Sequence, residues 1–138
     1  MTASYASMLA GTTATGLFSW RGTPERDLAA EAEAAGWLAL RLDTRHIGST
    51  GDFYAEVAGQ WSLPAWFGRN LDALFDVLAD LSAGPTVLVW DGLVRLGDVD
   101  PEQASAVVDV LRDAVGQSVA LAVVVRDDLG VNGFDGLL

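Results

Sequence analysis

Residues 63–81 read Leu63-Pro-Ala-Trp-Phe-Gly-Arg-Asn-Leu-Asp-Ala-Leu-Phe-Asp-Val-Leu-Ala-Asp-Leu81. Pro64 and Gly68 lie in a short loop that carries two aromatic residues, and Asn70 follows at a position typical of a helix N-cap. From there leucines recur with helical spacing, which predicts an amphipathic helix with one face in a core. The leucines of this face are Leu71, Leu74, Leu78 and Leu81.

The opposite face of the predicted helix is acidic. Asp72, Asp76 and Asp80 recur at every fourth position, with no basic residue among them. Like charges at this spacing destabilise an isolated helix by roughly 0.2–0.5 kcal/mol per pair. Phe75 lies beside these acids rather than among the leucines. Such a face is often plain solvated surface on an acidic protein. The two rings in the preceding loop, where one apolar residue would suffice, favour a binding surface for a cationic partner.

The composition supports a basic protein as that partner. The chain of 138 residues has 19 acidic and eight basic residues, a net charge of −11, and no cysteine. All eight bases are arginines. This balance argues against nucleic acid as a ligand, because phosphate binding needs a basic surface. No stretch reaches the length of a membrane span, and the first 15 residues lack a secretory signal. We therefore expect a cytoplasmic protein of one domain, residues 1–138.

Apolar runs and turn signals alternate along the chain and predict an α/β fold. We expect a small, mainly parallel β-sheet packed against helices, with residues 1–15 as a loose arm and residues 126–138 as an irregular tail. Predicted strands cover residues 17–20, 37–43, 86–90 and 118–125. Predicted helices begin at Thr23-Pro24, near Asp52, at Asn70 and at Asp100-Pro101, and a polar linker follows Asp91-Gly92. Arg41 interrupts its apolar run, which indicates a strand end or an edge strand.

The central stretch resembles the barstar family of intracellular ribonuclease inhibitors. The resemblance rests on the pattern Pro-x-aromatic-Phe-Gly-x-Asn-x-Asp-Ala-Leu from Pro64 to Leu74, within residues 53–81. It continues more weakly to about Val125, through the order of strands and helices. The family's fold is similar to the predicted one. Residues 17–36 then form an N-terminal strand and helix beyond the shortest family members.

The resemblance also implies roles for single residues. Asp76 would be the central anion in an enzyme active site, with Asp72 as its neighbour, and Trp66 would pack against the enzyme's catalytic imidazole. Gly68 would let the backbone come close, while Asn70 caps the helix and holds the loop. Each aromatic residue of the loop also has a plain alternative as a core residue, and Asp80 and Asp113 have one as solvated acids. The predicted partner-binding residues are Trp66, Phe67, Gly68, Asn70, Asp72, Phe75, Asp76, Asp80 and Asp113.

Catalytic motifs are absent from the sequence. His46 is the one histidine and lies in a turn-rich segment, where we expect a surface residue rather than a metal ligand or a triad base. No phosphate-binding loop or dinucleotide fingerprint occurs. Asp72 and Asp76 are spaced like paired carboxylates for acid–base chemistry, but a convex helix face offers no dry cleft. We therefore expect no enzyme, no cofactor and no metal site.

The resemblance, together with the acidic charge, implies an inhibitor of a basic microbial ribonuclease of the barnase type, monomeric when free, which binds the enzyme as a 1:1 complex. An acidic helix and the aromatic loop before it would block the active site. The alternative is an immunity protein, antitoxin or regulatory module that binds a different basic protein, one that is not a nuclease.

Overall fold

A computed structural model describes residues 4–11, 15–118, 120–127 and 134–138. The helices are α1 (Tyr5–Leu9), α2 (Leu28–Ala34), α3 (Thr50–Gln60), α4 (Leu71–Leu81), α5 (Leu93–Val99) and α6 (Pro101–Gln117). The strands are β1 (Leu17–Trp20), β2 (Leu38–Asp43), β3 (Thr86–Asp91), β4 (Leu121–Val125) and β5 (Asp135–Leu137).

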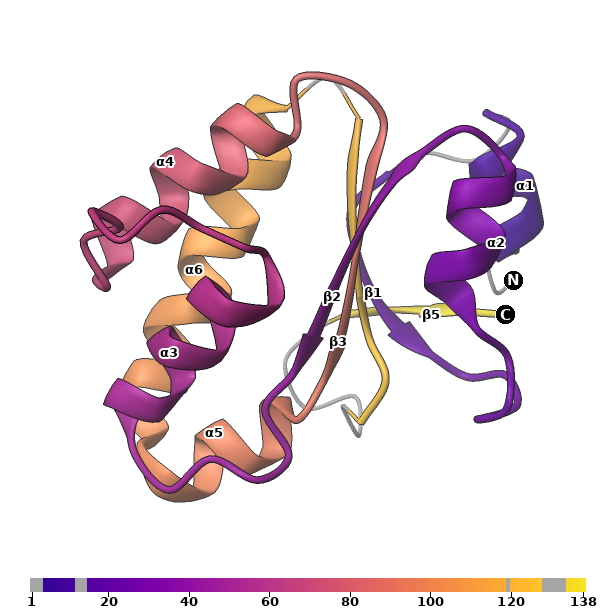
Figure 1. Cartoon of the computed structure of the whole chain (residues 1–138). Helices are drawn as coiled ribbons and strands as arrows, with labels where there is room; N and C mark the ends of the chain where they lie inside the picture. Colours follow the sequence, from indigo (N-terminus) through magenta and orange to yellow (C-terminus); the bar gives the residue numbers. More distant parts are fainter. Residues whose placement is uncertain (1–3, 12–14, 119, 128–133) are drawn as a thin grey trace.

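The strands form one sheet in the order β2-β3-β4-β1-β5, and every neighbouring pair runs parallel. Helices α3 to α6 cover one face of the sheet, and α1 and α2 cover the other (Figure 1). All five residues of the central strand β4 are buried, as expected for a parallel strand with both faces covered. The predicted α/β fold with a parallel sheet is confirmed.

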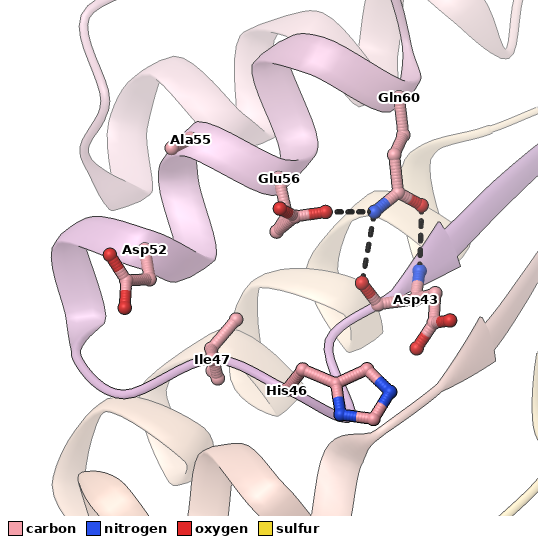
Figure 2. A pocket seen from close by; sticks show the side chains of 7 residues that line it. All are labelled: Asp43, His46, Ile47, Asp52, Ala55, Glu56 and Gln60. Atoms are coloured by element: carbon pink, nitrogen blue, oxygen red, sulfur yellow. Dashed lines mark hydrogen bonds between the residues drawn. The ribbon is translucent and has the colours of Figure 1, made fainter.

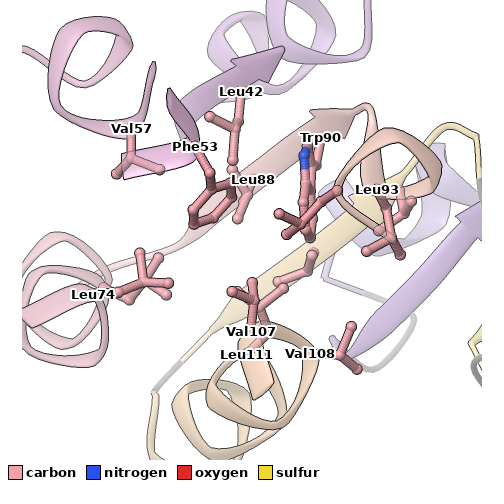
Figure 3. Close-up of a cluster of buried hydrophobic side chains, with 14 of the residues drawn as sticks. Leu42, Phe53, Val57, Leu74, Leu88, Trp90, Leu93, Val107, Val108 and Leu111 are labelled. Atoms are coloured by element: carbon pink, nitrogen blue, oxygen red, sulfur yellow. The ribbon is translucent and has the colours of Figure 1, made fainter. Parts of the chain in front are cut away.

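Side chains alternate along each strand, so the buried side chains form two hydrophobic clusters, one on each face of the sheet. In β3, Leu88 and Trp90 point into the cluster beneath α3 to α6, whereas Val87 and Val89 point toward α1 and α2. Figure 3 shows the larger cluster, where side chains from four helices meet the sheet. Its labelled members are Leu42, Phe53, Val57, Leu74, Leu88, Trp90, Leu93, Val107, Val108 and Leu111.

The strand with Arg41 is an edge strand, as its sequence indicates, and helix α3 seals part of that edge. The Gln60 side chain accepts a hydrogen bond from the Asp43 backbone N–H (2.7 Å) and donates one to the Asp43 carbonyl oxygen (2.9 Å). Trp61 Nε1 donates to the Arg41 carbonyl oxygen (3.0 Å). These bonds occupy backbone groups that another strand would otherwise pair with.

The expected loose N-terminal arm is wrong for residues 5–9, which form α1. Tyr5 and Met8 lie on one face of this short helix and are fully buried. The Tyr5 hydroxyl donates to the Leu28 carbonyl oxygen (2.6 Å), so the helix is tied to α2. Burial of this phenol raises its pKa. One helical turn is too short to give a recognisable period in the sequence. Residues 1–3 and 12–14 of the predicted arm lie outside the described residues.

The prediction of an irregular tail is wrong for its end, because residues 135–137 form β5 beside β1. Leu137 is fully buried and Phe134 nearly so. The Leu138 carbonyl oxygen accepts a hydrogen bond from the Tyr5 backbone N–H (2.5 Å). The tail is therefore held by partners from the opposite end of the chain. Residues 128–133 of the predicted tail lie outside the described part.

Two further expectations differ from the structure. The helix expected from Thr23-Pro24 begins at Leu28, where the Asp27 side chain accepts from the Ala30 N–H (3.1 Å). The polar linker expected after Gly92 is helix α5. Its first N–H groups, those of Leu93 and Val94, donate to the carboxylate of Asp127. That residue lies 34 positions from Leu93 in the sequence, which explains why no local capping signal announces the helix.

Candidate functional site

The start of α4 is fixed by its cap. The Asn70 side chain accepts a hydrogen bond from the Ala73 N–H (2.8 Å), and its amide donates to the Gly68 carbonyl oxygen (3.1 Å). The predicted N-cap is confirmed, and the same side chain fastens the preceding loop to the helix. A Cβ atom at Gly68 would lie 3.2 Å from the Ala73 Cβ and 3.2 Å from Asn70 Nδ2. The glycine therefore lets the loop lie directly against the helix start.

Helix α4 separates its apolar and acidic residues as the sequence predicts. Leu74 and Leu78 are buried in the larger hydrophobic cluster. Asp72, Asp76 and Asp80 are exposed. In the part of the chain that the structure describes, none of these three carboxylates takes part in an ion pair. The helix therefore presents a row of free negative charges on a firmly packed base.

The two aromatic residues of the loop have opposite environments. Trp66 is 81% exposed, the most exposed of the large apolar side chains in the described residues. Phe67 is only 5% exposed, and its ring centroid lies 6.5 Å from that of Tyr54 on α3. Phe67 therefore takes the core position that the sequence leaves open as an alternative to a partner-binding role: its ring packs into the core and anchors the loop. Of the two rings, only that of Trp66 projects from the loop.

Phe75 and Asp113 lie on neighbouring helices. Phe75 is half-buried and lines a groove of about 170 Å³ between α4 and α6, which also includes Ala79 and Ala114. Asp113 is exposed on α6, the helix that packs against α4. Asp80 is exposed one turn beyond Asp76, farther from the loop. The aromatic ring next to the acids is thus supported by the second helix.

Another pocket, of about 280 Å³, lies between the end of β2 and α3 (Figure 2). It contains the exposed His46 and the hydrogen-bonded side chains of Glu56 and Gln60. A bidentate contact from Arg45 lowers the pKa of Asp43, at the same pocket, to about 2. None of the lining residues belongs to α4 or its loop. Among the described residues, no cluster of His, Cys, Asp or Glu could hold a metal ion. The acidic helix remains the better candidate site.

Arg69 is not among the residues that the sequence analysis singled out, although it lies next to the helix cap. It is exposed beside the helix cap and has a positive φ of 52°. It lines an open hollow of about 420 Å³. A signal was present, because Arg69 is the one arginine between Arg45 and Arg95. The hollow is lined by Tyr54, Arg69, Asn70, Leu71, Asp72 and Gln103.

A family model described as Barstar (barnase inhibitor) matches residues 37–126, which is more than half of the chain. The matched region contains β2, β3 and β4 with helices α3 to α6, and therefore the whole acidic helix and its loop. Elements α1, β1, α2 and β5 lie outside it. None of the helices in the described residues is long and apolar enough to cross a membrane.

Proposed function

The chain belongs to the barstar family, and on this premise we propose that it inhibits a basic microbial ribonuclease of the barnase type by blocking its active site. One observation carries the proposal. Exposed carboxylates on α4 and an exposed indole in the loop that leads into it are close together in the sequence, and the opposite face of α4 is buried. The buried leucines and the Asn70 cap hold this helix and its loop in place, which should reduce the ordering needed when a partner docks.

The chemistry of the partner explains why carboxylates are suited to this task. A ribonuclease must hold a phosphate with cationic side chains at the bond it cleaves. Carboxylates can take the place of that phosphate and form charge-assisted hydrogen bonds, often bidentate with arginine. The cationic cleft repels itself when empty, and the acidic row on α4 does the same. Association relieves both repulsions, while the net charge of −11 accelerates the encounter with a basic protein.

Each residue of the site has a part in this proposal. Asp76 is the central anion, with Asp72 on the side of the loop and Asp80 at the outer end. Trp66 offers its ring to the catalytic imidazole of the enzyme. Phe75 and Asp113 extend the surface toward α6. The remaining predicted residues, Phe67, Gly68 and Asn70, hold the loop in place.

Cleavage of RNA by a barnase-type ribonuclease tests the proposal. We expect stoichiometric inhibition by the parent protein and a loss of affinity of about 3 kcal/mol, roughly a hundredfold or more, for Asp76→Ala. Asp98→Ala serves as the matched control, because Asp98 is an exposed acid on α5, at the other end of the helical layer (Figure 1). Its removal changes the net charge equally but should leave inhibition almost unchanged.

The outcomes separate the alternatives. Equal inhibition by the parent and Asp76→Ala would remove Asp76 from the site. No inhibition by any form would contradict the ribonuclease as target. It would favour an immunity protein, antitoxin or regulatory module for a different basic protein, which a salt-sensitive pull-down of basic proteins would then identify.

A further inference from the structure

Arg69 is a cation at the edge of an otherwise anionic surface. Most other arginines of the chain have a carboxylate partner, as in the pairs of Arg26 with Glu31 and of Arg45 with Asp43. Within the described residues, the Arg69 side chain makes no ion pair, hydrogen bond or ring contact, although Asp72 lines the same hollow. Its guanidinium is therefore free to bind a group from outside the chain.

The backbone at Arg69 is unfavourable for a residue with a side chain. Its φ of 52° lies in the left-handed region, which glycine and asparagine adopt more readily than arginine does. Residues kept in such conformations cluster at binding and catalytic sites. Ser62, in the same connection between α3 and α4, is the other described non-glycine residue with positive φ, also 52°. It provides a matched position for comparison.

A free cation at this place restricts the partner. If Arg69 faced only the basic residues of a cleft, it would be repelled and would weaken the complex. A partner carboxylate facing Arg69 turns this repulsion into attraction, because the planar guanidinium binds a carboxylate through two parallel hydrogen bonds. The open hollow beside Arg69, between α3 and the starts of α4 and α6, has room for an incoming side chain.

We propose that Arg69 is a specificity-determining residue, which selects ribonucleases that carry an acidic side chain at the rim of their basic cleft. The inference rests on the proposed function and concerns the same surface. Asp72 and Asp76 address the cationic part of the cleft. Arg69 discriminates among basic enzymes that the acidic row alone would accept equally.

Reversing the charge at position 69 tests the inference by the direction in which the Kd changes. Arg69→Glu makes the inhibitor more acidic and would strengthen binding if only basic groups faced this position. We expect the opposite: the Kd for a barnase-type ribonuclease should rise about a hundredfold. Part of this rise should disappear at high salt, because salt screens the repulsion between the new glutamate and the acidic rim. Arg21→Glu is the control, since Arg21 is also exposed and without a side-chain partner among the described residues, and it follows β1, away from α4. Its reversal should leave the Kd unchanged or slightly lower.

A second pair of variants separates charge from backbone strain. Arg69→Gly should resist urea at least as well as the parent yet bind about tenfold more weakly, since one charged contact is lost. Ser62→Gly relieves the same backbone conformation and should bind with parent affinity. Unchanged or tighter binding by the Arg69 variants, with normal inhibition by the parent, would overturn this inference alone. Failure of the parent itself to inhibit would overturn the proposed function and the inference with it.

Discussion

Trp66 and Phe67 are neighbours in sequence, and the structure predicts opposite consequences when each is changed to alanine. Trp66 is 81% exposed and Phe67 5% exposed. Trp66→Ala should therefore fold like the parent and bind poorly, whereas Phe67→Ala should fold poorly. No other adjacent pair in the site separates binding from stability so clearly.

The magnitude for Trp66 follows from the surface it still has to bury. A tryptophan buries roughly 150–250 Å² at about 25 cal/mol per Å². With 81% of the residue exposed in the free protein, docking can gain about 3–5 kcal/mol. Ordering and imperfect desolvation reduce this gain. We expect a loss of about 2–3 kcal/mol, a rise of about 30- to 150-fold in Kd. The free energy of unfolding should change by no more than about 0.5 kcal/mol.

Phe67→Ala removes a ring that packs beside Tyr54. The lost apolar contacts and the cavity left behind should lower the free energy of unfolding by about 3–5 kcal/mol. Any loss of inhibition by this variant would follow from disorder of the loop, because its ring does not reach the surface.

Urea denaturation and inhibition titrations, run on the same preparations, test the pair. Leu38→Ala is the control for Trp66→Ala, since Leu38 is an apolar residue, 45% exposed, on the β2 edge. It should affect affinity little. A Trp66→Ala variant with parent affinity, or one destabilised by more than about 1 kcal/mol, would refute the reasoning about this residue. A fully stable Phe67→Ala variant would refute the assignment of its ring to the core.

Three further changes test other parts of the fold. Asn70→Ala removes the cap on the Ala73 N–H and should lower the free energy of unfolding by about 1 kcal/mol, as urea denaturation would show; no change would mean that the cap is not needed. The buried Trp90 indole N–H donates to the Thr44 hydroxyl (2.9 Å). Thr44→Val removes this acceptor and should lower the free energy of unfolding by about 1–3 kcal/mol. Thr44→Ser should retain the bond and most of the stability. The contact with Arg45 lowers the folded-state pKa of Asp43 to about 2. This stabilisation is therefore present above the ordinary pKa near 4 and is lost as the pH falls from about 4 to about 2. The side chain is 42% exposed, so the effect is small. Asp43→Asn should flatten the acid limb of a stability–pH curve, and identical slopes in parent and variant would contradict this.

Local signals in the sequence predicted most of the helices and strands that position the site. Asn70 and Asp100 cap the helices that follow them, and Gly36, with a φ of 88°, comes after the end of α2. The continuous apolar runs at β3 and β4 lie in the middle of a covered parallel sheet. These features depend on residues a few positions apart, so the sequence alone suffices to recognise them.

The expectations that failed depend on partners distant in sequence. Helix α5 is capped by Asp127, and β5 exists because β1 offers it a parallel edge. The separate environments of Trp66 and Phe67 have the same origin. In the sequence both are aromatic residues of a loop, and nothing nearby distinguishes them. Phe67 is buried because its ring packs near Tyr54 on α3. A pattern along one chain segment cannot supply that information.

The segment from Ser62 to Asp80 departs from local stability rules in several ways at once. It holds like charges one turn apart, an exposed indole and the two non-glycine residues with positive φ among those described. Each departure lowers the stability of the free protein. Leu74 and Leu78, buried beneath the helix, and the cap at Asn70 provide compensating stabilisation. Several destabilising features gathered in one well-packed segment are expected at a functional surface and not on plain solvated surface. A cationic partner would remove the repulsion along α4, so part of its affinity would come from strain that already exists in the free protein.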